Sequence, residues 1–212
     1  MIVGIGHRKR VGKDTFAGLL AKSLENLGFE VLQEGFADKL KDVCNQIYGW
    51  AGIERADFYD RFPAEREKRN PILGMTPREL WIKFGTNAVR REVYDDTWLD
   101  YLLMQQGRCD VLIIPDVRFR NEFNRIRSDG GILIKVSRLS APKSTDIADC
   151  NLDDETTWDY VVHNEGDMAG LEATARAIAG DIGRAIVKEV NEGVSVSGHF
   201  RESSTGHEVS DK

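Results

Sequence analysis

The residues with the clearest chemical potential form a loop that can bind phosphate. The loop runs Gly6-His7-Arg8-Lys9-Arg10-Val11-Gly12-Lys13-Asp14-Thr15, between a predicted strand and a predicted helix. In such a loop, consecutive backbone N–H groups surround a phosphate, and the positive end of the following helix points at the same oxygens. Lys13 can bridge the β- and γ-phosphates of a nucleoside triphosphate, and Gly12 allows close backbone approach. The sequence therefore predicts a Walker A type site for ATP.

This loop departs from the usual pattern in two places. Five residues separate Gly6 from Gly12 instead of four, so that His7 stands where the first glycine belongs. Asp14 replaces the Ser or Thr that normally holds Mg²⁺. Either Asp14 binds the metal, directly or through water, or Thr15 contacts phosphate and other carboxylates serve the metal. The alternative to a phosphate site is an ordinary surface junction between strand and helix.

A second carboxylate follows the most apolar run of the chain. Asp116 comes shortly after residues 111–114, which are Val-Leu-Ile-Ile. An aspartate at the end of a buried strand is typical of a Walker B residue that orients Mg²⁺. The alternative is that Asp116 caps the helix predicted to begin near Phe119.

Two arginines also follow predicted strands. Arg118 lies two residues after Asp116, and Arg138 closes the next strand. A guanidinium at the first position can clamp an acceptor phosphate, and one at the second can reach the phosphoryl group in transfer. Each arginine alone is more commonly a surface salt-bridge partner. The loop cations Lys9 and Arg10 are likewise either solvated or in contact with phosphate.

Hydrophobic periodicity and turn residues place these groups on an alternating series of elements. Strands are predicted at residues 2–5, 29–33, 111–114, 132–136 and 160–162. Helices are predicted at residues 14–27, 37–48, 76 to about 85, 96–106, 119–128 and 171–190. The helix at 76 has a strong start, since Thr76, Pro77 and Glu79 fit the N-cap, N1 and N3 positions. Residues 51–75 are predicted to be irregular, with short helical pieces.

The alternation predicts an α/β fold with a parallel sheet flanked by helices on both faces. In such sheets ligands bind beyond the carboxyl ends of the strands. The segments that follow the strands are therefore the predicted site: residues 6–15, 34–38, 115–122, 137–138 and 163–166.

Composition narrows the class of protein. A formal net charge of −6 argues against stable binding of a nucleic-acid backbone, which favours basic proteins. The three cysteines, Cys44, Cys109 and Cys150, form no C-x-x-C pair, which argues against a zinc site and suits a reducing cytoplasm. We see no signal peptide and no apolar run long enough for a membrane span. The expectation is one cytoplasmic domain over residues 1–190.

Several motifs together resemble the bacteriophage-type deoxynucleoside monophosphate kinases, over roughly residues 1 to 185. The resemblance rests on Gly12-Lys13-Asp14-Thr15, Gly35-Phe36-Ala37-Asp38-Lys39-Leu40-Lys41, Thr76-Pro77-Arg78-Glu79-Leu80, Phe84-Gly85-Thr86, Trp98, Asp116-Val117-Arg118-Phe119 and Asn121-Glu122. It implies a three-layer P-loop kinase fold with a nucleoside-monophosphate-binding excursion at about 36–106 and a small lid. It also implies transfer of the γ-phosphoryl group from ATP with Mg²⁺ to a dNMP, in the host cytoplasm if the chain is phage-encoded.

The resemblance assigns residues to both substrates. The acceptor side would comprise Phe36, Ala37, Asp38, Lys41, Arg78, Gly85, Thr86, Arg90, Trp98, Arg118 and Glu122. The donor side would comprise residues 6 and 8–15, Arg138, and Asn164 with Gly166 beside the adenine. Lys13, Asp116, Arg118 and Arg138 would be catalytic, with Asp14, Thr15 and Asp116 near Mg²⁺. Family members suggest a homodimer, to which the helix at 76–90 would contribute.

The chain departs from the family in the predicted lid, at about residues 139–157. This stretch carries Lys143, Ser144 and several acidic residues, with few arginines to cover phosphate. Residues 191–212 have little apolar content and are predicted to be a disordered tail. Two alternatives to a dNMP kinase stay open: a P-loop kinase with another acceptor, such as a modified base in DNA or a phosphomevalonate-like molecule, and a nucleotide-binding regulatory protein.

Overall fold

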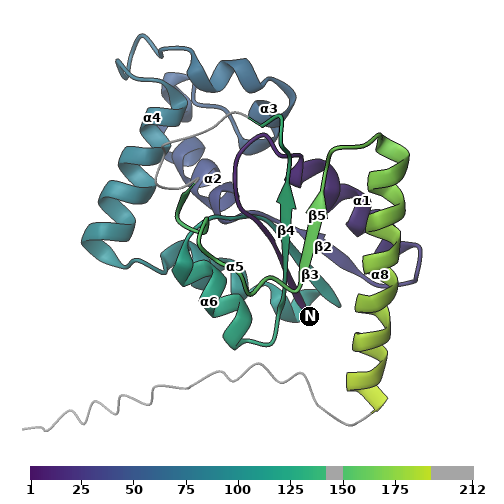
Figure 1. Ribbon diagram of the computed structural model, residues 1–212. Helices are drawn as coiled ribbons and strands as arrows, with labels where there is room; N and C mark the ends of the chain where they lie inside the picture. The colour runs from purple at the N-terminus through teal and green to yellow at the C-terminus, as the bar shows by residue number, and fades with distance from the viewer. Residues whose placement is uncertain (142–149, 192–212) are drawn as a thin grey trace, which may run out of the picture.

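A single parallel sheet organises the protein. The computed structural model describes residues 1–141 and 150–191. Its strands are β1 (Ile2–Gly6), β2 (Val31–Gln33), β3 (Val111–Val117), β4 (Ile132–Ser137) and β5 (Tyr160–His163). The strand order is β2-β3-β1-β4-β5, and each neighbouring pair is parallel. The predicted parallel sheet flanked by helices is therefore confirmed (Figure 1).

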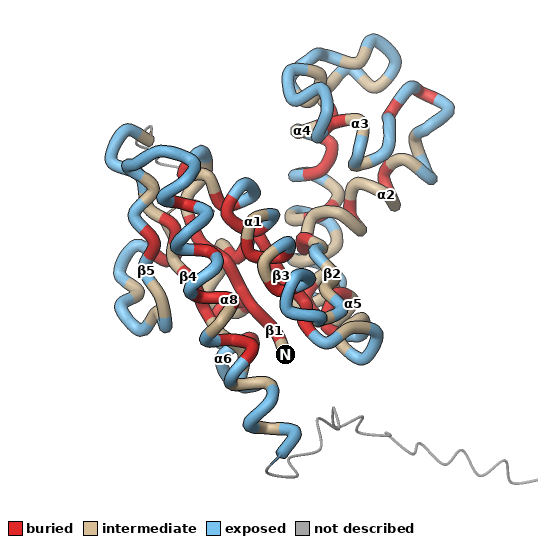
Figure 2. Tube along the Cα trace, turned by 90° about the vertical axis from the view of Figure 1, so that its right-hand side faces the viewer, coloured by how far each residue is buried: buried red, intermediate tan, exposed pale blue. Residues whose placement is uncertain are grey.

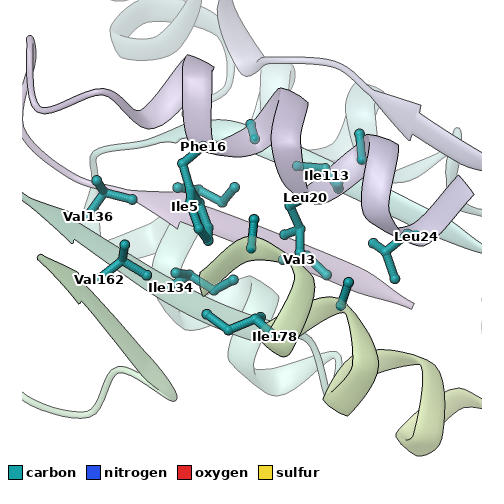
Figure 3. Packing of buried hydrophobic residues seen from close by; sticks show 14 of the residues in the cluster. Val3, Ile5, Phe16, Leu20, Leu24, Ile113, Ile134, Val136, Val162 and Ile178 are labelled. Atoms are coloured by element: carbon teal, nitrogen blue, oxygen red, sulfur yellow. The ribbon is translucent and has the colours of Figure 1, made fainter. Parts of the chain in front are cut away.

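The middle strands are buried on both faces because their apolar side chains alternate between two cores. One face of the sheet packs against α1 (Lys13–Glu25) and α8 (Met168–Asn191). Figure 3 shows this core, in which Phe16 and Leu20 of α1 and Ile178 of α8 meet Val3 of β1 and Ile134 of β4. The opposite face packs against α5 (Thr97–Leu103) and α6 (Arg120–Ser128).

A helical insertion between β2 and β3 has a small core of its own. It includes α2 (Phe36–Tyr48), η1 (Gly49–Ala51), α3 (Ala56–Arg61), η2 (Pro63–Glu67), α4 (Pro77–Trp81) and η3 (Ile82–Val93), and ends with α5 and η4 (Gln106–Arg108). Its third core consists of Leu40, Cys44, Ile53, Tyr59, Leu80 and Trp81. Figure 2 shows α3 and α4 standing away from the sheet.

The predicted start of α4 is confirmed, but its predicted end is wrong. The Thr76 hydroxyl accepts a hydrogen bond from the Glu79 N–H (3.1 Å), and the Thr76 N–H donates to the Glu79 carboxylate (2.8 Å). The helix was expected to stop near Gly85, whereas it continues as the π-type helix η3 to Val93. Gly85 is needed for packing instead: a Cβ there would lie 2.3 Å from the Leu40 side chain.

Two predicted segments lie partly or wholly outside the described residues. Of the predicted lid, residues 142–149 are not described, and these include Lys143, Ser144, Asp146 and Asp149. The predicted tail is described only to residue 191. Within the described ranges, no helix combines the length and the apolar character that crossing a bilayer requires.

Candidate functional site

The loop between β1 and α1 has an uncommon backbone conformation at two positions. Arg10 and Gly12 both have positive φ, at 60° and 93°. At Gly12 the conformation itself favours glycine, and a Cβ would also lie 2.3 Å from the Asn164 amide nitrogen. The left-handed Gly12 is followed by the right-handed start of α1, a combination that turns successive N–H groups toward one anion. Glycine at position 12 is therefore explained by its positive φ and by Asn164, and its role toward a phosphate stays a prediction.

Lys13 and Asn164 both contact the backbone of this loop. Lys13 is buried, at 5% exposure, and its ammonium donates a hydrogen bond to the Arg8 carbonyl. The Asn164 side chain, just after β5, donates to the Val11 carbonyl (2.9 Å). The sequence assigned Asn164 to the donor adenine, and the structure adds a contact that holds the loop itself. The Lys13 ammonium thus lies against the backbone of the loop, and its contact with phosphate stays a prediction.

His7 and Arg8 are held by a residue that the sequence did not single out for this role. The Asp153 carboxylate accepts hydrogen bonds from His7 Nε2 (2.8 Å), Arg8 Nε (2.9 Å) and Arg8 Nη2 (2.6 Å). The Arg8 side chain keeps the pKa of Asp153 low, at about 2. Burial lowers the pKa of His7 below its ordinary value, and the hydrogen bond with Asp153 acts in the opposite direction.

Asp116 lies at the carboxyl end of β3, as predicted, and it caps α2 rather than the helix near Phe119 that was the alternative to a metal role. Its two carboxylate oxygens accept hydrogen bonds from the Phe36 N–H (2.9 Å) and the Ala37 N–H (3.3 Å), at the start of α2. The cap of α6 near Phe119 is supplied by Glu122. Burial, together with the nearby Asp38 charge, raises the pKa of Asp116. Its proposed contact with Mg²⁺ stays a prediction.

Glu122 connects the end of β3 to the insertion. One carboxylate oxygen accepts from the N–H groups of Arg118 (2.8 Å) and Phe119 (3.0 Å), and the other from Arg90 Nη1 (3.3 Å). Glu122 is 4% exposed, and burial raises its pKa to about 7. The Arg90 guanidinium also lies 4.5 Å from the centre of the Phe119 ring. Two residues of the predicted acceptor pocket, Arg90 and Glu122, are thus in direct contact.

An open cleft of about 340 Å³ adjoins this pair. Its lining consists of Thr86, Arg90, Arg91, Asp95, Phe119, Arg120, Asn121 and Asn151. Of the predicted acceptor residues, Thr86 and Arg90 line the cleft. The remaining residues offer two further guanidinium groups, two amides, an aromatic ring and the Asp95 carboxylate, which pairs with Arg90 (2.9 Å).

Other predicted acceptor residues serve packing or local hydrogen bonds in this structure. Trp98 packs between the second and third cores and donates a hydrogen bond to the Gly85 carbonyl (3.3 Å). Phe36 is buried in the second core. Arg78 pairs with Glu67 (3.3 Å), and Lys41 pairs with Asp38 (2.7 Å). Their roles toward a substrate stay predictions.

The predicted metal and donor residues are not gathered into a preformed cage. Asp14 and Thr15, in the first turn of α1, are exposed. Arg138, which follows β4, and Gly166, which follows β5, are exposed as well. In the described ranges, no group of three or more His, Cys, Asp or Glu side chains can hold a metal ion. The contact of Asp14, Thr15 and Asp116 with Mg²⁺ therefore stays a prediction.

Comparison with known proteins gives one curated relative. No protein-family model matches the chain. The chain is 27% identical over 179 residues to a protein of Acanthamoeba polyphaga mimivirus named "Putative deoxynucleotide monophosphate kinase", covering 77% of this chain and 88% of that protein. Among solved structures it is similar to shikimate kinase from Aquifex aeolicus, with a TM-score of 0.42 and 11% identity, over 91% of this chain and 100% of that one.

Proposed function

We propose that this protein is a kinase that transfers the γ-phosphoryl group of ATP to a deoxynucleoside monophosphate. The observation that carries the proposal is the loop after β1, in which Gly12 is left-handed and the buried Lys13 ammonium donates a hydrogen bond to the Arg8 carbonyl. The name of the mimivirus relative supports the same activity. The arginine-lined cleft between α6 and the insertion supports an anionic acceptor.

The donor side of the reaction requires neutralisation of charge rather than acid–base chemistry. The transferring phosphoryl group spreads charge over its oxygens, and positioned cations stabilise that charge. Lys13 would contact the β- and γ-phosphates, while the N–H groups at the start of α1 would bind their oxygens. Mg²⁺ would be held near Asp14 and Thr15 and would neutralise the phosphates; Asp116 faces the same end of the sheet but already accepts two N–H groups.

The acceptor side would use the cleft beside Arg90. A deoxynucleoside monophosphate has a planar base and a dianionic phosphate, and the cleft supplies Phe119 and Asn121 for the first and Arg90, Arg91 and Arg120 for the second. Arg118 would orient the acceptor phosphate toward the donor. Its backbone N–H is fixed by Glu122, so its side chain leaves β3 at a defined point.

The test incubates the protein with ATP, Mg²⁺ and each of the four deoxynucleoside monophosphates in turn. The release of ADP is measured in each case. Acceptor-dependent ADP, together with formation of the matching dNDP, is the expected result. ADP release that is the same without any acceptor would indicate a hydrolytic regulatory protein. If the protein binds ATP but releases no ADP with any of the four monophosphates, a kinase with another acceptor would be indicated.

The substitution Lys13→Ala tests whether Lys13 acts in phosphoryl transfer rather than in folding. Turnover should fall at least about a hundredfold, because a charge that follows the transferring phosphoryl group is lost. The thermal unfolding midpoint should change little. Lys22→Ala, an exposed lysine on the same helix, is the matched control and should retain turnover. Wild-type turnover in Lys13→Ala would refute the assignment of the loop.

A further inference from the structure

We propose that Asp153 is a positioning residue for the phosphate loop: its carboxylate fixes His7 and Arg8 and so keeps the lengthened loop in its phosphate-binding shape. The proposal rests on the proposed function, since it assigns Asp153 a role in binding ATP. It concerns a residue more than 140 positions away from the loop in sequence.

The contacts define both the position and the direction of the loop side chains. Asp153 Oδ1 lies 2.8 Å from His7 Nε2 and 2.9 Å from Arg8 Nε, and Oδ2 lies 2.6 Å from Arg8 Nη2. A two-point contact with a guanidinium restricts rotation as well as distance, and charge-assisted hydrogen bonds are the strong ones. One carboxylate therefore constrains two adjacent residues of the loop.

His7 requires such a constraint because it stands where a phosphate loop normally has glycine. Its side chain is 4% exposed and lies beside Trp158, with ring centres 6.0 Å apart. Trp158 also fills the space at Gly6, where a Cβ would lie 2.5 Å from its ring. His7 Nδ1 is buried without a hydrogen-bond partner in the described structure. The bond from Nε2 to Asp153 is therefore the polar contact that offsets burial of this imidazole.

Asp153 is itself anchored on both sides. The preceding Leu152 is fully buried in the second core, and Asn151 accepts a hydrogen bond from the Arg120 backbone N–H (2.8 Å). Two residues after Asp153, the Glu155 carboxylate pairs with the Arg120 side chain (2.9 Å). Because the chain is held on both sides of Asp153, its carboxylate is suited to fixing the loop. It is poorly suited to moving aside for a competing phosphate.

This placement gives a prediction opposite to that of simple electrostatics. Asp153 carries a negative charge beside a loop proposed to bind a triphosphate. If charge alone mattered, removing it would tighten ATP binding. If Asp153 positions the loop, removing it releases His7 and Arg8 and weakens ATP binding. The sign of the change in affinity therefore distinguishes the two explanations.

The experiment is calorimetric titration of ATP with Mg²⁺ into the wild type, Asp153→Ala and Asp154→Ala. Asp154 is the matched control, since it has the same charge one position later but pairs with Arg120 at the surface. Asp153→Ala should raise the dissociation constant at least about tenfold, the scale of one charge-assisted hydrogen bond. Asp154→Ala should stay within about twofold of the wild type. In turnover, the KM for ATP should rise in Asp153→Ala while kcat and the KM for the acceptor change far less.

Unchanged or tighter ATP binding in Asp153→Ala would overturn the proposal. If that variant does not fold, Asp153→Asn replaces it, because an amide keeps an acceptor for His7 and loses the charge for Arg8; affinity equal to the wild type would then be the contrary result. Failure of the wild type to bind ATP would instead refute the proposed function. The two ideas can therefore fail separately.

Discussion

At the scale of single residues, buried polarity marks the region proposed to be the active site. Among the described residues, the buried polar or charged side chains are those of His7, Lys13 and Glu122, and all three contact segments at the carboxyl end of the sheet. Burying such groups is costly unless partners are supplied. The chain supplies them from the loop backbone, from Asp153 and from Arg90.

Glu122 should make stability depend on pH in an identifiable window. Burial raises its folded pKa to about 7 from an ordinary 4.5, so the folded state holds a proton that the unfolded state releases. The resulting stabilisation is complete below about pH 4.5 and is lost as the pH rises to about 7. Across that window, Glu122→Gln should gain about 3 kcal/mol in free energy of unfolding relative to the wild type. Urea unfolding at several pH values measures this difference.

The control for that measurement is Glu155→Gln. Hydrogen bonds from Thr157 lower the pKa of Glu155, so its linkage has the opposite sign and lies below pH 4.5. Between pH 5 and pH 7 its unfolding curve should run parallel to that of the wild type. If the unfolding free energies of Glu122→Gln and the wild type also ran parallel between pH 5 and pH 7, Glu122 would be ionised in the folded protein across that range.

At the scale of elements, regular patterns were predictable and long-range partners were not. The apolar run at 111–114 and the helical spacing in α1 follow from local rules, so strands and helices were found close to their places. The end of η3 was missed because Gly85 looked like a helix stop, while its actual constraint is Leu40, far away in the chain. The cap that Asp116 forms on α2 was not predicted for the same reason, since the only cap considered for it was on the nearer helix.

The candidate functional site shows the same difference between local patterns, which were predictable, and long-range partners, which were not. The loop between β1 and α1 was predictable because its motif is continuous in sequence, while its binding of phosphate stays a prediction. Asp153 was not, because it lies in a polar, acidic stretch with no periodic pattern, and its contact with His7 spans 146 positions. The acidic character of that stretch looked unsuited to covering phosphate, yet one of its carboxylates is bound to the loop cation Arg8.

Packing of Gly85 against Leu40 gives a prediction for the insertion. Gly85→Ala should lower the free energy of unfolding by about 1–3 kcal/mol, because the added methyl group forces Leu40 to move. In a Leu40→Ala background the same change should cost close to nothing. Chemical denaturation of the four proteins gives this coupling directly.

Gly18→Ala in α1 is the matched control, since no atom lies within 4 Å of the added Cβ. It should be neutral or stabilising by about 0.5–1 kcal/mol, as alanine is the better helix residue. If Gly85→Ala behaved like Gly18→Ala, the close approach of η3 to α2 would be contradicted.

At the scale of the whole molecule, the cores of the sheet and the core of the insertion are separate sets of residues. Arg90, Glu122 and Trp98 lie where these parts meet. The proposed acceptor cleft is therefore built from both, and its shape depends on how the insertion packs against α6. The loop proposed to bind the donor lies between β1 and α1 and is contacted by Asp153, which precedes β5, and by Asn164, which follows it.

Cys44 offers a measure of opening in the insertion. It is fully buried, and burial raises its pKa to about 11, so about one molecule in a thousand carries the reactive thiolate at pH 8. Cys44 should react with a thiol reagent at least about a hundredfold more slowly than the half-buried Cys109, as peptide mass spectrometry would measure. Leu80→Ala, which loosens the third core, should raise the rate at which Cys44 reacts with the reagent and leave the rate for Cys109 unchanged. Equal rates in the wild type would mean that the insertion core opens freely.

The central position of β1 has a consequence for synthesis on the ribosome. Its partners come late, since Ile2 pairs with Leu112 and Val3 pairs with Ile132. At about 5–20 residues per second, the nascent chain carries an unpaired apolar strand for roughly 5–20 s before either neighbour emerges. During that time its edges are open to wrong partners, which is the hazard that chaperones address. Of the five described strands, β1 is made first, yet it must wait for β3 and β4 before either of its edges is paired.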